Sequence, residues 1–259
     1  MARVSLVEIR RDAQVCVLTL RREDKLNALS TELERQLGDA LAGEDARSAR
    51  CVVLTGGGRG FSAGADVDEL RDRSPEAVVA YYRETGEVYE QVAALPQPTL
   101  SAISGYCLGG GLELALATDF RIADETAIFG FPEVSIGILP SSGGTQRLTR
   151  LLGPGRAKEL VLLRDRLDAA ESLAAGLVTE VVPAGAALER ALELAGRLAD
   201  LPALAVSLCK QAIDAMPESS RAAGILIERL AYGLLAQTDD ARGAADAFSE
   251  RGSARRSGA

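Results

Sequence analysis

Apolar and polar positions change their period along this chain, and the change separates two kinds of segment. Short runs that alternate, or that are rich in β-branched residues, predict strands. These runs lie at Val4–Arg10, Val15–Leu20, Cys51–Thr55, Thr99–Ile103, Phe120–Ala123, Ala127–Phe131 and Val178–Val182. Between them lie longer stretches in which apolar residues recur at the spacing of a helix turn. Alternating strands and helices predict an α/β fold.

Capping residues mark where the first helices begin. Ser30 is a good N-cap for a helix that runs to about Ala42. A second helix is expected over Ser74–Ala94, because a proline there occupies the first helical position. Shorter helices are expected at Arg156–Leu163 and Ala169–Ala175.

The alternation ends near residue 184, and only helical patterns follow. They lie at Ala187–Asp200, Ala203–Ala215, Ser219–Gln237 and Asp239–Glu250. We therefore expect an α/β core over residues 1–184 and an all-helical region over residues 185–259. One helix of that region has an apolar stripe that fits either the chain's own core or another chain. The stripe consists of Leu226, Ile227, Leu230, Leu234 and Leu235.

Composition and charge narrow the class of protein. The chain has 259 residues, of which 47% are hydrophobic, enough for a sizeable core. A net charge of −8 argues against nucleic acid as the main partner, because binding to phosphates needs a basic surface. We find no signal-peptide pattern and no uncharged apolar run of membrane-spanning length. A soluble, cytoplasmic protein that does not bind membranes is expected.

Histidine is missing from the sequence, which removes several kinds of active site. Ser–His and Cys–His nucleophile systems and the common zinc sites all require it. The four cysteines lie far apart in apolar runs and form no Cys-x-x-Cys motif. They are predicted to be buried free thiols in a reducing compartment. They are Cys16, Cys51, Cys107 and Cys209.

A glycine triplet, Gly109–Gly111, stands directly before an apolar helical run. Glycines let a backbone turn tightly, and the first N–H groups of a helix lack partners within it. These groups also lie at the positive end of the helix dipole, so the site can stabilise an oxyanion. Glu113 lies one turn further on among leucines, where a charged group is costly unless it has a partner or a function.

A second carboxylate, Glu133, follows Pro132 at the end of a β-rich run. A glycine-rich loop and a new helix start are then expected over Pro140–Leu148. Two carboxylates in apolar settings can divide acid and base roles if their environments differ. The alternative is that one or both glutamates are ordinary, since charged residues make up 25% of the chain.

Another glycine-rich segment, Gly56–Asp66, follows the predicted strand Cys51–Thr55. Gly58, Gly60 and Ala63 fit the dinucleotide-binding pattern G-x-G-x-x-A, but no clear βαβ unit surrounds them. The segment is therefore either a flexible turn or a turn that faces a ligand and supplies a second oxyanion donor.

Four motifs, in this order, resemble those of the enoyl-CoA hydratase/isomerase (crotonase) superfamily, and most of all its enoyl-CoA hydratases. They are Lys25–Leu29, Phe61–Asp66, Gly105–Ala115, and Pro132-Glu133 together with Gly143–Leu148. The resemblance implies a crotonase-like spiral of ββα units with a C-terminal, all-helical trimerisation region. It also implies a homotrimer, or a homohexamer built as a dimer of trimers.

The same resemblance implies a reaction and the residues that perform it. The backbone N–H groups of Ala65 and Gly110 would form an oxyanion hole for the thioester oxygen of an acyl-CoA. Hydratases of the family carry two catalytic glutamates, which match Glu113 and Glu133. The pair implies addition of water to a 2-enoyl-CoA, as in fatty acid metabolism, with coenzyme A as part of the substrate and no cofactor or metal. A double-bond isomerase and a non-catalytic acyl-CoA-binding or scaffolding member are the open alternatives.

Coenzyme A is expected to lie with its adenine near residues 63–67. In relatives, a basic residue of the tail reaches a phosphate of the coenzyme A in a neighbouring subunit. The implied CoA-binding residues are Lys25, Ala63, Ala65, Asp66, Val67 and Arg251. Two departures from the family pattern stand out: Arg22-Glu23 replaces an Arg-Pro pair, and Phe131 occupies a position that is polar in some hydratases. We expect the Phe131 ring to reshape the acyl pocket.

Overall fold

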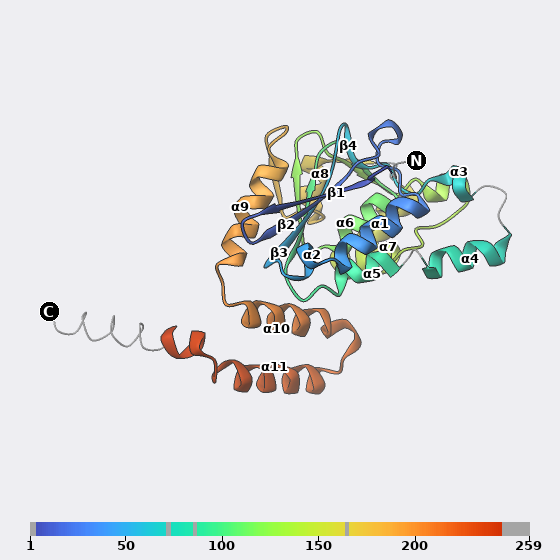
Figure 1. Cartoon of the computed structure of the whole chain (residues 1–259). Helices are drawn as coiled ribbons and strands as arrows, with labels where there is room; N and C mark the ends of the chain where they lie inside the picture. Colours follow the sequence, from blue (N-terminus) through green and yellow to red (C-terminus); the bar gives the residue numbers. More distant parts are fainter. Residues whose placement is uncertain (1–3, 71–73, 85–86, 164–165, 245–259) are drawn as a thin grey trace. The chain divides into compact units, whose positions relative to one another are not determined.

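The computed structural model describes residues 4–70, 74–84, 87–163 and 166–244. The chain divides into two compact units, Met1–Ala199 and Asp200–Ala259, and each is treated by itself (Figure 1). The strands of the first unit are β1 (Val7–Asp12), β2 (Val15–Leu20), β3 (Cys51–Gly56), β4 (Gly60–Ser62), β5 (Thr99–Ile103), β6 (Tyr106–Leu108), β7 (Phe120–Asp124), β8 (Ile128–Gly130), β9 (Leu167–Asp168) and β10 (Glu180–Val182). Its helices are α1 (Thr31–Ala42), α2 (Glu44–Arg47), α3 (Val67–Leu70), α4 (Pro75–Glu84), α5 (Glu87–Ala93), α6 (Gly110–Ala117), α7 (Gly144–Lys158), α8 (Ala169–Ala175) and α9 (Ala187–Ala199).

The strands form two sheets that are mainly parallel. The larger has the order β1-β2-β3-β5-β7-β10, in which only β1 runs antiparallel to its neighbour. The smaller has the order β4-β6-β8-β9, with β9 antiparallel at one edge. Parallel strands are covered on both faces, and β2, β3 and β5 are accordingly buried along almost their whole length. The predicted α/β class is confirmed.

Alternate residues of the central strands face two separate apolar clusters. In β2, Cys16 and Leu18 belong to the larger cluster, which also contains residues of α1, α5 and α6. Val15 and Val17 belong to the other cluster, which contains residues of α9. Figure 1 shows α9 beside the strands of the larger sheet. One residue in four along α9 is a buried alanine, and these small side chains let the helix lie close to the sheet. They are Ala187, Ala191, Ala195 and Ala199. This packing places α9 in the first unit, so the observed division differs from the predicted boundary after residue 184 by this helix.

The second unit contains helices α10 (Ala203–Asp214) and α11 (Arg221–Leu235), which pack against each other. Four members of the predicted stripe, Leu226, Ile227, Leu230 and Leu234, are exposed within this unit. Cys209 of α10 is also exposed, on a helix that has no buried residue among those described. The prediction that all four cysteines are buried is therefore wrong for Cys209 and correct for the other three.

Most differences from the expected elements concern short or broken segments. The expected helix over Ser74–Ala94 is two helices, α4 and α5. The first strand begins at Val7 rather than Val4. Strands β4, β6 and β9 had not been expected, because runs of two or three residues carry too little periodicity to be recognised. Within the described residues, no helix is long and apolar enough to cross a membrane.

Candidate active site

Helix α6 carries the glycine triplet and Glu113, and both of its ends are fixed. At the N-terminus Gly109 has a φ of 50°, and its N–H donates to Gly130 O of β8 at 2.9 Å. At the other end the buried guanidinium of Arg121 donates to Thr118 O at 2.7 Å and to Leu177 O at 2.8 Å. All eight residues of the helix are buried. Glu113 therefore lies on a buried helix that is held by hydrogen bonds at both ends.

The Glu113 carboxylate is buried and bound by backbone donors. Its side chain is only 3% exposed, and Oε1 accepts the N–H groups of Ser142 and Gly144, both at 2.7 Å. Burial raises the pKa of Glu113 above its ordinary value, while these donors and the nearby charge of Arg147 act in the opposite direction. The two bonds explain why a glycine-rich loop comes before α7: a methyl group on Gly144 would lie 2.8 Å from Glu113 Oε1.

Arg147 braces the loop that binds Glu113. Its guanidinium donates to Ser142 O at 2.9 Å and forms an ion pair with Glu90 of α5 at 2.6 Å. Gly143, which ends the loop, has a φ of 94°, a conformation that favours glycine. The motif Gly143–Leu148 thus fixes the orientation of a carboxylate on another helix.

Glu133 lies in a short 3-10 turn, Glu133–Ile136, directly after β8, and its environment differs from that of Glu113. It is 8% exposed, and its buried Oε2 atom has no hydrogen-bond partner among the residues that the structure describes. Burial, and to a smaller extent the charge of Glu113, raise the pKa of Glu133 to about 7. A methyl group on Gly109 would lie 2.8 Å from Glu133 Oε1, so this glycine makes room for the carboxyl group. Both predicted carboxylates are therefore buried: Glu133 borders the first glycine of the triplet, and Glu113 lies at the loop before α7.

The backbone N–H groups of Ala65 and Gly110 come from separate segments and lie near each other. A methyl group on Gly110 would lie 3.4 Å from Ala65 N, and one on Gly64 would lie 3.4 Å from Gly110 N. In the part of the chain that the structure describes, neither N–H has a hydrogen-bond acceptor. Gly110 is the first residue of α6, where the helix leaves its N–H groups free.

The glycine-rich segment after β3 leads into strand β4 rather than into a helix, so it does not form the dinucleotide-binding unit. The residues that follow β4 pair with the segment before α1. Leu29 N donates to Gly64 O at 2.8 Å, and Asp66 N donates to Leu29 O at 2.9 Å. Asp66 also forms an ion pair with Arg22 at 2.6 Å.

The predicted CoA-binding residues are only partly brought together. Ala63, Ala65 and Asp66 are half-buried, and Val67 is exposed beside them. Lys25 is exposed in the 3-10 turn Glu23–Lys25 that leads into the Lys25–Leu29 motif. Arg251 lies outside the described residues. Phe131 is buried in the larger apolar cluster.

Known proteins are similar to this chain over nearly its whole length. The family model described as "Enoyl-CoA hydratase/isomerase" matches residues 10–257. The chain belongs to the enoyl-CoA hydratase/isomerase family. It is 38% identical over 245 residues to the 2,3-dehydroadipyl-CoA hydratase of Escherichia coli, covering 94% of this chain and 95% of that protein. It is 35% identical over 248 residues to the short-chain-enoyl-CoA hydratase of Clostridium acetobutylicum, covering 95% of each.

Solved structures of the enoyl-CoA hydratase/isomerase family have the same fold. The crystal structure of the enoyl-CoA hydratase from Bacillus anthracis superposes with a TM-score of 0.89 at 39% identity, covering 95% of this chain and 97% of that one. The enoyl-CoA hydratase from Thermoplasma volcanium gives 0.86 at 33% identity, covering 95% and 96%. The predicted family and the crotonase-like fold are confirmed.

Within this family's first motif, the structure assigns a role to a residue that the sequence reasoning had missed. Asn27 is fully buried, and its side-chain amide donates to Gly57 O at 2.9 Å and to Gly60 O at 2.8 Å. Its Oδ1 atom accepts Arg22 N–H at 2.8 Å. Asn27 therefore fixes the glycine-rich turn that precedes Ala65. An asparagine between apolar residues was the only signal in the sequence, and it does not by itself indicate a buried side chain.

Asn27→Ala should destabilise the protein by about 2–4 kcal/mol, because it leaves two buried carbonyls and one N–H without partners. Chemical denaturation followed by circular dichroism measures this loss. Asn27→Asp is the matched variant: it keeps the acceptor for Arg22 but loses the donors, so it should also be destabilised. Wild-type stability of both variants would contradict the assigned role.

Proposed function

We propose that this protein is an enoyl-CoA hydratase, which adds water across the 2,3 double bond of a 2-enoyl-CoA to give a 3-hydroxyacyl-CoA. One observation carries the proposal: of two buried carboxyl groups in different environments, one borders the glycine triplet, where the N–H groups of Gly110 and Ala65 lie near each other without an acceptor among the described residues. This arrangement supplies a base, an acid and an oxyanion site for one reaction.

The environments of the two glutamates support separate roles. Glu113 accepts two backbone N–H bonds, which favour its ionised form, so it is the base that takes a proton from water as the oxygen adds to C3. Glu133 has a pKa of about 7 and no donor on Oε2, so it is available in its protonated form to deliver a proton to C2. The hydroxyl of the water thus adds to C3, the remaining proton of the water goes to Glu113, and the proton of Glu133 goes to C2.

The N–H groups of Ala65 and Gly110 are proposed to bind the thioester oxygen, on which negative charge develops when water adds. Donors that are already oriented before the reaction stabilise such charge without reorganisation. The proposed steps require no metal and no cofactor other than the coenzyme A of the substrate.

A panel of 2-enoyl-CoA esters that differ in chain length and branching tests the activity. Hydration of each ester is measured as the loss of the absorbance of its conjugated thioester. The same protein is given 3-enoyl-CoA esters, because an isomerase would convert these to 2-enoyl-CoA without taking up water. Glu125→Gln, at an exposed glutamate, is the control for the change of charge. Turnover of only the 3-enoyl esters would favour an isomerase, and binding without turnover of either would favour a non-catalytic member.

For coenzyme A, we propose binding through Lys25, the segment Ala63–Val67 and Arg251, mainly through backbone groups. The half-buried alanines of this segment leave room for a flat ring beside the proposed oxyanion site. Ala63→Trp should therefore raise KM by a similar factor for every acyl-CoA in the panel. A rise confined to long acyl chains would place the acyl tail there and contradict the proposed orientation.

We further propose a homotrimer, either alone or as half of a hexamer, that is located in the cytoplasm and binds neither nucleic acid nor membranes. The exposed leucines of α11 support assembly, because an uncovered apolar stripe of this length favours burial against another chain. The three buried, unpaired cysteines fit a reducing compartment.

Sedimentation of the full-length protein at micromolar concentration should show a trimer or hexamer. Leu230→Glu, which places a charge on the stripe at a position that is 66% exposed within its own unit, should shift the distribution towards monomer. Exposed Arg229 offers a matched control, since Arg229→Glu changes the neighbouring residue off the stripe. A single monomeric species of the unchanged chain would contradict the assembly.

A further inference from the structure

A third buried carboxylate lies close to the candidate site, and the proposed reaction does not use it. Glu34 lies on the buried side of α1, together with Leu33, Leu37 and Leu41, and is 4% exposed. Two tyrosines donate to it: Tyr81 Oη to Oε2 at 2.9 Å and Tyr89 Oη to Oε1 at 3.0 Å. A carboxylate at such a position is costly unless donors satisfy it, and these hydroxyls do so.

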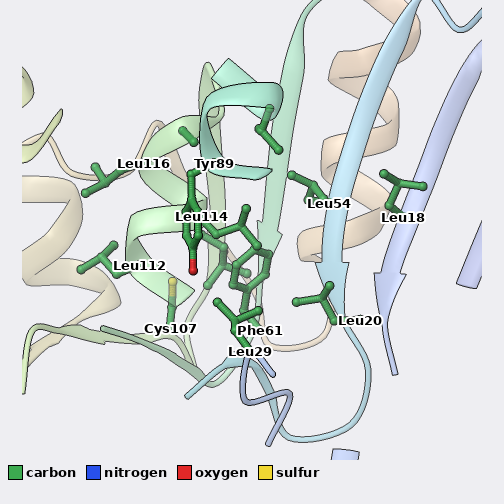
Figure 2. Packing of buried hydrophobic residues seen from close by; sticks show 14 of the residues in the cluster. Leu18, Leu20, Leu29, Leu54, Phe61, Tyr89, Cys107, Leu112, Leu114 and Leu116 are labelled. Carbon is green, nitrogen blue, oxygen red and sulfur yellow. The ribbon is translucent and has the colours of Figure 1, made fainter. Parts of the chain in front are cut away.

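The two tyrosines have different neighbours. Tyr89 of α5 lies in the larger apolar cluster next to α6 (Figure 2). A methyl group on Gly110 would have three nearest atoms: Tyr89 Oη at 3.2 Å, Ala65 N at 3.4 Å and Leu29 Cδ1 at 3.4 Å. The Tyr89 hydroxyl oxygen therefore borders the same small space as the two proposed oxyanion donors. Tyr81 of α4 is not among these nearest atoms.

The hydroxyl of Tyr89 has a fixed direction. Its proton is directed to Glu34, and its oxygen lies 3.2 Å from the position that a methyl group on Gly110 would occupy. Burial and the charges of Glu34 and Glu113 raise the pKa of Tyr89 well above its ordinary value, so the hydroxyl stays protonated at any pH at which the enzyme is assayed. The Tyr89 hydroxyl thus donates to Glu34 at every assay pH, and its oxygen stays next to Gly110.

We propose that Tyr89, oriented by Glu34, is a positioning residue for the hydration reaction: it holds the first residue of α6 so that the N–H of Gly110 faces the thioester oxygen. The proposal rests on the proposed function, in which Gly110 supplies an oxyanion donor. It adds a residue outside the four motifs, on the helix whose Glu90 pairs with Arg147. Small displacements of an oriented donor have large effects on rate, because the bond is strongest in the transition state.

The test compares Tyr89→Phe with Tyr81→Phe. Each variant removes one hydroxyl from the same carboxylate and keeps its ring, so the two should lose similar thermal stability. Tyr89→Phe should lower kcat for 2-butenoyl-CoA about tenfold with KM within about twofold of wild type, since the oxyanion bond forms fully only in the transition state. Tyr81→Phe should keep a wild-type kcat, because its hydroxyl does not border Gly110.

A second readout does not depend on turnover. The probe is acetoacetyl-CoA, whose enolate absorbs strongly in the ultraviolet; an absorbing complex with the protein would report on the proposed oxyanion site through the anionic oxygen of the enolate. Tyr89→Phe should weaken this absorbing complex about tenfold, whereas Tyr81→Phe should leave it unchanged. If Tyr89→Phe does not fold, Glu34→Gln serves in its place, because it keeps an acceptor for Tyr89 but weakens the bond, and it should lower kcat in the same direction.

Three outcomes would overturn the proposal: equal losses of kcat in the two tyrosine variants, a wild-type kcat in Tyr89→Phe, or a wild-type kcat in Glu34→Gln where that variant replaces it. Failure of the proposed function is distinguishable from these, because the unchanged protein would then hydrate no 2-enoyl-CoA in the first place.

Discussion

Glu113→Gln should lower kcat for hydration about 10²- to 10⁴-fold, because an amide cannot take a proton from the attacking water. The substitution keeps the size of the side chain. Its carbonyl oxygen can still accept the N–H groups of Ser142 and Gly144, which now bind Oε1 at 2.7 Å. The loop before α7 should therefore stay in place, and the loss should appear in kcat rather than in folding.

Steady-state kinetics with 2-butenoyl-CoA measure the loss, and thermal unfolding checks the fold. Glu125→Gln makes the same chemical change at an exposed position and should have wild-type kcat. If Glu113→Gln kept more than about a tenth of the wild-type rate, Glu113 could not be the base, since a positioned base contributes roughly 10²-fold or more.

The sequence predicted those features that depend on residues near one another in the chain. Ser30 was expected to cap α1, and its side chain accepts Leu33 N–H. The strands β2 and β5 lie at the predicted residues. A parallel strand that is buried on both faces has no polar face, so the change to polar residues marks its ends. Glu113 and Glu133 could be selected because charged residues beside glycines and apolar runs are unusual enough to need a reason.

Long-range features could not be predicted in the same way. The bonds from the loop before α7 to Glu113, and the contact of Glu133 with Gly109, join segments whose sequence spacing carries no periodicity. The cluster around Glu34 was missed for a similar reason: on α1 this residue resembles any solvated glutamate until α5 packs against it. The difference between the environments of the two catalytic candidates likewise depends on packing, so the sequence could not predict it.

Glu133→Gln should abolish hydration to a similar degree, about 10²- to 10⁴-fold in kcat, because the amide has no proton of suitable acidity for C2. In the unchanged enzyme, kcat/KM should fall as the pH rises through about 7, where Glu133 loses the proton that it must deliver. It should also fall at acid pH, where Glu113 becomes protonated. A rate that did not change between pH 6 and pH 9 would contradict the role of Glu133 as the acid.

The same substitution should also raise stability, and this effect separates it from ordinary damage to the fold. The folded-state pKa of Glu133, about 7, lies above its ordinary value of 4.5, so ionisation at higher pH disfavours the folded state. Below about pH 4.5 the group is neutral whether the chain is folded or unfolded, and the variant should match the wild type. Above pH 7 the variant avoids the burial of a charge and should be more stable by roughly 3 kcal/mol. Unfolding curves at pH 4 and pH 8 measure this difference. An equal or lower stability of the variant at pH 8 would show that Glu133 is not held in an environment that favours its proton, and the assignment of the acid would fail with it.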